Sequence, residues 1–420
     1  MQFYLLSKRR APFFCVVLFA LVSSDAVVAA EWSIEPSVSL YEEYNDNVRF
    51  TTSPHPGVWQ TTLSPSIKLS SKTEVSEVSG LAQLGVNRYT GDPQVEDSND
   101  KLFSLRTSFQ SERNAWAMNA GYKQDSTTES ELLATGVVQT RTQRTVSSLN
   151  PSWTRTLTER SSFRLDYNYQ DVKYGSHINL NDYTNQQASG TLQYQLTERD
   201  QVSLSVNHSV LEYAPISNTV ILVNPPALGT DTTVNKSSSN NVQAGVTRLF
   251  SETLHGSLVL GLRSTVSSAS HTCTSCFTQV GTPIAANETR GSGTSINATL
   301  EKAFESSKVS GFVSRETNPS GSGLVETDKL GVSLNRNLTE NLTGSVDAIS
   351  YHTKYISLAY PSSRYYTFEP KLNWRFTEWW TLDAGYRYGR FESGSIVNAT
   401  TSNAVYLNLT YNWPKKAISL

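Results

Sequence analysis

The segment from Trp153 to Tyr174 contains the feature that most restricts the fold, an alternation of apolar and polar residues on either side of a short polar turn. After the turn, Phe163, Leu165, Tyr167 and Tyr169 alternate with Arg164, Asp166, Asn168 and Gln170. Because successive side chains of a β-strand point to opposite faces, this pattern predicts one aromatic, apolar face and one charged or amide face. The apolar face would cover the core of a soluble sandwich, or it would meet lipid in an outer-membrane barrel whose polar face lines water.

The short polar turn recurs along the chain, each time with one glutamate between two alternating segments. These glutamates are Glu74, Glu112, Glu159, Glu198, Glu252, Glu305, Glu340 and Glu378. Their separations vary from 35 to 54 residues, which is too irregular for a solenoid or a propeller blade. A ladder of hairpins in which one connection is short and the other varies in length explains the spacing. Short turns at one rim and long loops at the other are typical of a transmembrane barrel.

The eight turns join sixteen strands, and the segments Trp32–Tyr44 and Val405–Trp413 add one strand at each end. The sequence therefore predicts an all-β fold, a single transmembrane antiparallel up-and-down β-barrel of about 18 strands (roughly 16–18), with short periplasmic turns and long extracellular loops. Expected long connections lie near residues 45–57, 90–99, 125–140, 175–183, 214–236, 268–290, 317–325, 356–364 and 393–402. The longest, 214–236 and 268–290, are candidates to fold inward and constrict the lumen. Pro36, Pro65, Pro151 and Pro370 fall in or beside expected strands, where they require bulges or shortened strands.

The N-terminal segment, residues 1–30, has the pattern of a cleaved signal peptide. Lys8-Arg9-Arg10 precedes an apolar run from Ala11 to Val22, and Val28-Ala29-Ala30 forms a small-residue cleavage site before Glu31. We therefore expect three parts: the signal peptide (1–30), an outer-membrane barrel (31–413) and a short C-terminal tail (414–420). An exported protein located in the outer membrane follows from this division.

Composition excludes several classes of protein. The formal net charge of −2 gives no basis for nucleic-acid binding. After the signal peptide, no apolar run reaches the length of a transmembrane helix, which excludes an integral helical protein. The chain contains 20 Tyr and 8 Trp against 2 Met and 3 Cys, and these aromatic residues favour membrane interfaces.

Several segments of the sequence resemble those of a known family. They are the opening EWSIEPSVSLYEEYNDNVRF, the turns SWTRTLTER and YQLTERDQVSL, and the closing strand VYLNLTYNW. Together they are similar to the family named "putative β-barrel porins" of Gram-negative bacteria, which includes outer-membrane barrels of exopolysaccharide gene clusters. The resemblance implies a pore or a polysaccharide-export role in the outer membrane, with membrane lipid and the barrel-assembly machinery as partners. The chain departs from such barrels at its end, where Trp413 is followed by PKKAISL instead of closing on an aromatic residue.

Few residues suggest chemistry. Cys273 and Cys276 predict a small loop disulfide in an exported chain; a redox site or a metal site with His271 are the alternatives. We predict no metal site and no cofactor, because the histidines lack ligand spacing. We also predict no catalytic residues and no enzyme activity. A barrel hydrolase with its serine at one rim is the weaker alternative.

The predicted lumen contains more information about solutes. Alternation places eight basic side chains inward: Lys68, Arg106, Lys123, Arg164, Arg263, Lys371, Arg375 and Arg387. The inward acids are Glu35, Asp166, Asp347 and Asp383. The excess of basic residues favours a small anionic solute or a sugar, although inward charges of both signs also pair across strands. The sequence thus predicts a porin-like channel for hydrophilic solutes or an exported exopolysaccharide chain. The alternative is a structural or adhesive barrel that acts through its extracellular loops.

Overall fold

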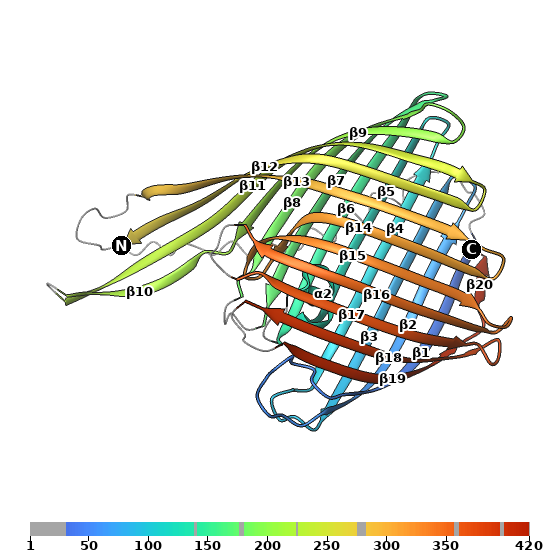
Figure 1. Cartoon of the computed structure of the whole chain (residues 1–420), viewed down its shortest axis with the longest axis horizontal. Helices are drawn as coiled ribbons and strands as arrows, with labels where there is room; N and C mark the ends of the chain where they lie inside the picture. Colours follow the sequence, from blue (N-terminus) through green and yellow to red (C-terminus); the bar gives the residue numbers. More distant parts are fainter. Residues whose placement is uncertain are drawn as a thin grey trace.

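The computed structural model describes residues 31–137, 141–175, 180–223, 226–274, 283–356, 361–394 and 399–419. Eighteen antiparallel strands, β1–β9 and β11–β19, form one closed ring, and β19 returns to pair with β1 from Ser37↔Asn412 to Asn45↔Ala404. Figure 1 shows the strands crossing the barrel at a steep tilt. The predicted fold class and the predicted number of strands are confirmed.

The first half of the ring consists of β1 (Glu31–Asn45), β2 (Val58–Lys72), β3 (Ser76–Thr90), β4 (Ser98–Gln110), β5 (Asn114–Ser126), β6 (Gln143–Thr158), β7 (Ser161–Tyr174), β8 (Tyr183–Gln195) and β9 (Asp200–Tyr213). The second half consists of β11 (Pro226–Ser251), β12 (Leu254–Thr274), β13 (Pro283–Ala303), β14 (Ser307–Ser320), β15 (Gly323–Asn337), β16 (Leu342–Tyr355), β17 (Ser363–Trp374), β18 (Trp380–Ser393) and β19 (Thr400–Asn412). Three elements lie outside the ring: β10 (Ile216–Val223), which pairs with the start of β11; β20 (Lys416–Ser419), which pairs with the start of β1; and the helix α2 (Thr127–Thr135).

The two rims of the barrel differ as the sequence predicts. Each of the eight predicted glutamates lies in a short connection, from Glu74 between β2 and β3 to Glu378 between β17 and β18. β1 begins and β19 ends at this rim, which we call the turn rim. The opposite end, the loop rim, carries the longer connections and α2. No helix in the described part of the chain has the length and apolar character needed to cross a membrane.

The outer face of the barrel is apolar and the inner face is polar. On β15, Leu330, Val332 and Leu334 are exposed, while the intervening Ser333 points to the inside. At the turn rim, Trp116 of β5 stacks on Trp153 of β6 with ring centroids 5.6 Å apart. Trp, Tyr and Arg near a rim suit the boundary between hydrocarbon and water. This arrangement fits strands that meet lipid with one face.

Each proline within a strand interrupts the pairing with one neighbouring strand, and the strand continues past the proline. The β2–β3 ladder skips from Leu63↔Val86 to Ser66↔Gln83 around Pro65. The β6–β7 ladder skips in the same way around Pro151, and the β17–β18 ladder around Pro370. Pro36 lies just beyond the last pair of β1 with β19. A missing N–H therefore removes local pairing on one side of each strand.

Three expected connections differ from the structure. Residues 317–325 do not form a long loop, because β14 and β15 continue to a two-residue turn and Ser320 pairs with Gly323. In the connections expected at 214–236 and 268–290, the described residues do not fold inward. β11 and β12 remain paired as far as Thr230↔Thr274, and with β10 and β13 they extend away from the barrel (Figure 1). Their Ser/Thr/Asn-rich backbone is satisfied by ladder hydrogen bonds, which a free loop would lack.

Candidate functional site

The segment that folds into the lumen is α2, which connects β5 to β6. The helix ends at Gly136, whose φ of +68° lets its N–H donate to the Leu132 carbonyl oxygen at 2.7 Å. Its last turn contacts β16, where Tyr351 Oη donates to the Leu133 carbonyl oxygen at 3.1 Å and Thr353 donates to the Thr135 carbonyl oxygen. β16 lies half-way round the ring from β6. The helical segment therefore crosses the lumen from one wall to the other.

Glu131 fixes α2 to a second inward structure. Its side chain is 1% exposed. Tyr174 Oη of β7 donates to Glu131 Oε2 at 2.8 Å, and the Gly321 N–H in the β14–β15 turn donates to Oε1 at 3.0 Å. Arg144 Nε of β6 lies 3.8 Å from Oε2. One carboxylate thus links the helix, two strands of one wall and the tip of the β14–β15 hairpin.

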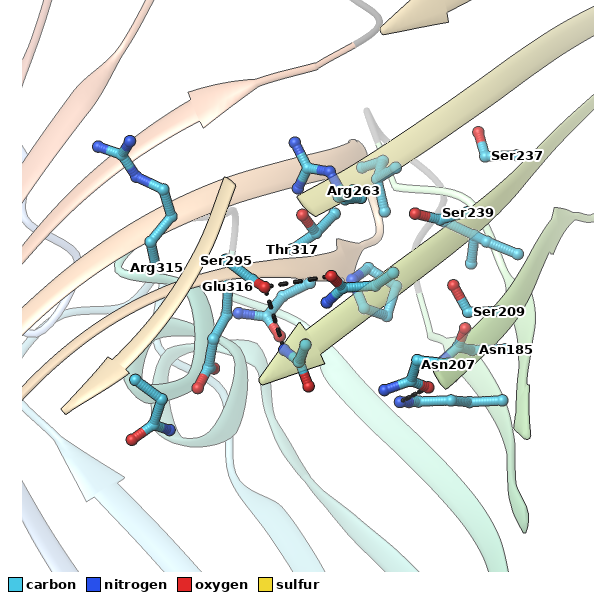
Figure 2. Close-up of a pocket in the computed structure, with 18 of the residues that line it drawn as sticks. Asn185, Asn207, Ser209, Ser237, Ser239, Arg263, Ser295, Arg315, Glu316 and Thr317 are labelled. Carbon is cyan, nitrogen blue, oxygen red and sulfur yellow. Dashed lines mark hydrogen bonds between the residues drawn. The ribbon is translucent and has the colours of Figure 1, made fainter. Parts of the chain in front are cut away.

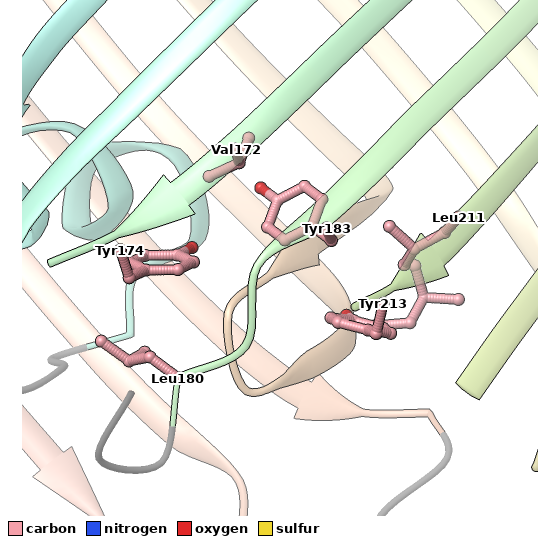
Figure 3. Close-up of a cluster of buried hydrophobic side chains, with 7 residues drawn as sticks. Val172, Tyr174, Leu180, Tyr183, Leu211 and Tyr213 are labelled. Carbon is pink, nitrogen blue, oxygen red and sulfur yellow. The ribbon is translucent and has the colours of Figure 1, made fainter. Parts of the chain in front are cut away.

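The β14–β15 tip reaches the opposite side of the loop rim. Tyr213 Oη of β9 donates to the Ser320 carbonyl oxygen at 2.9 Å, and the Asn181 N–H donates to the Gly321 carbonyl oxygen at 2.8 Å. Around this contact lies a buried cluster, shown in Figure 3, that consists of Val172, Tyr174, Leu180, Tyr183, Leu211, Tyr213 and Leu324. We call it the tyrosine cluster. Burial of these side chains favours the inward position of the tip.

A second buried cluster holds the other side of α2. Leu132 packs with Phe50 of the β1–β2 loop and with Tyr351, Tyr365 and Phe391 on β16–β18. Phe50 meets the Tyr365 ring edge-on at 5.7 Å between centroids. The helix is therefore held between two apolar clusters on opposite walls. α2 and the β14–β15 tip together narrow the lumen at the loop rim.

Glu129 on α2 is a titratable group at this constriction. Burial and the nearby Asp100 carboxylate raise the pKa of Glu129 from 4.5 to about 7; Asp125 adds to the rise, while Arg141 and Lys123 oppose it. A raised pKa means that the docked position favours the protonated carboxyl, so its docking stability is full at acid pH and is lost as pH rises through about 7.

We therefore expect single-channel conductance to fall when the pH is lowered from about 8 to about 5, because docked α2 narrows the lumen. Recording wild type and Glu129→Gln across this range in planar bilayers tests the prediction. The variant cannot ionise at this position and should lose most of the pH dependence. An equally steep response in both proteins would contradict the assignment to Glu129.

Most of the predicted inward cations form ion pairs with nearby acids. Lys68 pairs with Glu35 at 3.4 Å, Lys123 with Asp125 at 2.6 Å, Arg164 with Asp166 at 2.6 Å and Arg263 with Glu326 at 2.7 Å. Arg387 lies 3.4 Å from Glu43 and 3.0 Å from Glu369. Each of these cations is therefore largely compensated where it stands.

The remaining three predicted cations have different surroundings. Arg106 Nε donates to Asn119 Oδ1 at 2.9 Å, and Lys371 lies on the inner face of β17. Among the described residues, neither makes an ion pair. Arg375 follows the end of β17 and is exposed in the turn before β18, outside the strands. The structure does not bring the eight predicted cations together at one site.

Several inward acids and the helical constriction were not predicted from the sequence. Glu43, Asp100, Asp125 and Glu369 face inward with Glu35 and Asp166, so the basic excess expected from alternation is reduced. α2 lies in a segment expected to be a loop. A local signal for it exists in the pattern Ser126-Thr-Thr-Glu129, which spans the N-cap and the first turn, and in Gly136 directly after the helix.

The remaining expectations about chemistry rest partly on residues beyond those described. Cys276 lies outside the described residues, as does the expected signal peptide, so the predicted Cys273–Cys276 disulfide stays a prediction. Within the described ranges, no group of three His, Cys, Asp or Glu residues is placed to hold a metal ion.

Comparison with known proteins decides the family. Residues 27–412 match the family described as "Putative beta-barrel porin 2". The chain belongs to this porin family. A search of curated proteins gave no match.

Solved structures similar to this porin include other outer-membrane barrels. OccAB3 of Acinetobacter baumannii has 10% sequence identity and a TM-score of 0.47, with 92% of this chain and 99% of that chain covered. OccK5 (OpdH) of Pseudomonas aeruginosa has 10% identity and a TM-score of 0.45, covering 92% and 98%. OpdK of P. aeruginosa, solved with vanillate, has 9% identity and a TM-score of 0.45, covering 92% and 99%. Structural similarity at such low sequence identity says nothing about the solute of this porin. Its family implies an outer-membrane channel.

Proposed function

We propose that this porin-like channel passes small hydrophilic solutes passively, and that α2 with the β14–β15 tip limits their size. The observation that carries the proposal is a closed ring with a polar inner face, crossed by a helix that is fixed to both walls. Eighteen strands enclose more space than inward side chains alone fill, so a narrowing element is needed to select solutes. A long exopolysaccharide chain would pass only after α2 leaves the lumen.

Planar-bilayer recording of the purified barrel tests this function directly. Discrete conductance steps that decrease as neutral solutes of increasing size enter the pore are the expected result. A protein that inserts into membranes and shows heat-dependent gel mobility, but gives no conductance, would contradict the proposal.

Ion selectivity should depend on the inward cations that lack an acidic partner. Arg106→Gln with Lys371→Gln is expected to lower the preference for anions in a reversal-potential measurement, because neither charge is in ion-pair contact with an acid among the described residues. The matched control is Arg164→Gln with Asp166→Asn, which removes a paired cation and anion together. Opposite charges in contact largely cancel beyond about 10 Å at 0.1 M salt, so the control should leave selectivity unchanged. Equal shifts in both double variants would disprove this division of roles.

A structural or adhesive role is the second candidate, supported by the extension formed by β10–β13. This sheet projects beyond the ring (Figure 1), where it is available to another surface. Deleting residues 216–233 distinguishes the two functions. Loss of adhesion with unchanged conductance favours the adhesive role, whereas unchanged adhesion removes its support.

Localisation and partners complete the proposal. We propose that export removes residues 1–30, and N-terminal sequencing of the membrane-inserted protein should then begin at Glu31. The barrel-assembly machinery would recognise β19, which is followed by β20 paired with Glu31–Ile34 of β1. Removing residues 414–420 tests whether the short tail affects assembly, measured as the fraction of protein with folded gel mobility.

A further inference from the structure

The wall of the barrel divides between β13 and β14 near the loop rim. The two strands pair only as far as Ile296↔Arg315. Beyond this pair, β13 stays with β12 as far as Thr272↔Pro283, and β14 stays with β15 as far as Ser320↔Gly323. β13 therefore continues into the projecting sheet, while the β14–β15 hairpin bends inward to the tyrosine cluster. An opening in the wall ladder follows from this divergence.

Arg263 and Glu326 connect the two sides of the division. Arg263 Nη2 of β12 lies 2.7 Å from Glu326 Oε2 of β15, across the part of β13 that has left β14. Gly293 stands between them, and a Cβ at this position would lie 2.5 Å from Arg263 Nη2. A side chain at this position would displace the Arg263 guanidinium from its place beside Glu326.

A cavity of about 290 Å³ lies beside this division, on the inner wall formed by β8, β9 and β11–β14 (Figure 2). Amide and hydroxyl groups line much of it. Gln243 donates to Ser295 Oγ at 3.0 Å, and Ser295 Oγ lies 3.2 Å from Asn241 Oδ1. Gln187 donates to Asn207 Oδ1 at 2.7 Å. The volume is close to the lower limit of ligand pockets, about 300 Å³.

Three buried polar atoms at the cavity have no hydrogen-bond partner among the described residues. They are Arg263 Nε, Thr317 Oγ1 and Asn318 Nδ2. The Arg263 side chain is only 8% exposed, so Nε has little access to bulk water. Buried polar groups are almost always paired with protein, water or ligand. Because their residues line the cavity, two donors and a hydroxyl at its wall have no hydrogen-bond partner among the described residues.

The charges around the cavity cancel. Arg263 pairs with Glu326, Arg315 forms a two-bond pair with Asp328, and Glu316 lies 4.0 Å from Lys329. A charged ligand would meet no uncompensated opposite charge there. Amides and hydroxyls instead donate and accept in the way that sugar hydroxyls require. Leu211, Pro319 and Leu324 add small apolar surfaces suited to the C–H faces of a sugar ring.

We propose that this cavity is a binding subsite for an uncharged, hydroxyl-rich solute, a short neutral saccharide, held by the amide and hydroxyl groups of its wall, with Thr317 and Asn318 among them. The inference rests on the channel function proposed above and names the solute class that this lumen binds. The solute reaches the subsite beside the β13–β14 division, at the loop-rim side of the lumen.

Calorimetric titration of the intact detergent-purified barrel tests the proposal with maltotriose, cellotriose and mannotriose as neutral probes and trigalacturonate as the anionic probe. At least one neutral probe should bind, and trigalacturonate should bind more weakly. Thr317→Val and Asn318→Leu should each raise the dissociation constant about tenfold, because each removes a hydrogen bond to the ligand. Thr401→Val makes the same chemical change at an exposed position of β19 and should leave binding unchanged. Heat-dependent gel mobility verifies the fold of every variant.

Three results would overturn the subsite: no binding of any neutral probe, tighter binding of trigalacturonate, or equal affinities in wild type, Thr317→Val and Asn318→Leu. The first result would mean that the cavity holds water only. Binding in detergent does not depend on ion flow, so conductance is measured separately. Saccharide binding without conductance would reject the channel and keep the subsite, whereas conductance without binding would do the reverse.

Discussion

Replacing Glu131 with alanine is expected to raise the single-channel conductance several-fold. The substitution removes the acceptor of the Tyr174 hydroxyl and of the Gly321 N–H, both of which are buried at the loop rim. Each buried donor left without a partner costs about 1–3 kcal/mol. Two such losses total roughly 2–6 kcal/mol, and each 1.4 kcal/mol changes an equilibrium about tenfold. The docked state of α2 should therefore become a minor population.

A second substitution tests the same constriction from the opposite wall. Gly136 has a φ of +68°, and a Cβ there would lie 2.5 Å from Tyr351 Cβ. Gly136→Ala should displace the end of the helix from β16 and raise conductance without changing any charge. If both variants raise the conductance, release of α2 explains the increase, and loss of the Glu131 charge does not.

Leu133→Ala is the matched control, since Leu133 lies on the same helix with its side chain 54% exposed. It should conduct like wild type. Single-channel recording with the three variants, together with size exclusion by neutral polymers, gives the measurement. Unchanged conductance in folded Glu131→Ala and Gly136→Ala would mean that α2 does not limit flow.

Placing arginine on the outer face of β15 is expected to produce the largest loss of stability. Val332, near the middle of the strand, is 52% exposed on the apolar outer face. An arginine on the lipid face near the bilayer midplane costs about 2–4 kcal/mol, so Val332→Arg should lower the free energy of unfolding by this amount. The neighbouring Ser333→Arg places the same side chain on the inner face, where water solvates it. Its cost should be near zero.

Reversible urea unfolding in lipid vesicles, followed by tryptophan fluorescence, measures both variants. The comparison keeps strand, depth and substituted side chain almost constant, so the difference reports which face meets lipid. Equal destabilisation by Val332→Arg and Ser333→Arg would reject the assignment of the two faces. The opposite order would mean that the inside of the ring is apolar.

Local pattern was sufficient to predict the ring itself. The alternation after Thr158 and the recurrence of Glu74, Glu112 and their equivalents place strands and turns without knowledge of distant contacts. A strand has a period of two residues, and a tight turn needs only a few polar residues, so both are properties of short segments. The fold class, the number of ring strands and the rim that carries the short turns could therefore be predicted from the sequence alone.

Only the tertiary structure decided what lies inside the ring. The constriction depends on contacts such as Glu131 with Gly321 and Tyr213 with Ser320, which are 190 and 107 residues apart. Whether Arg387 acts on a solute depends on Glu43, brought close by closure of β1 onto β19. The alternation of apolar and polar residues predicts which face a side chain occupies, but it does not predict which side chain lies opposite across the lumen. The partners of inward residues, and therefore the free charges and the width of the path, were fixed only when the barrel closed.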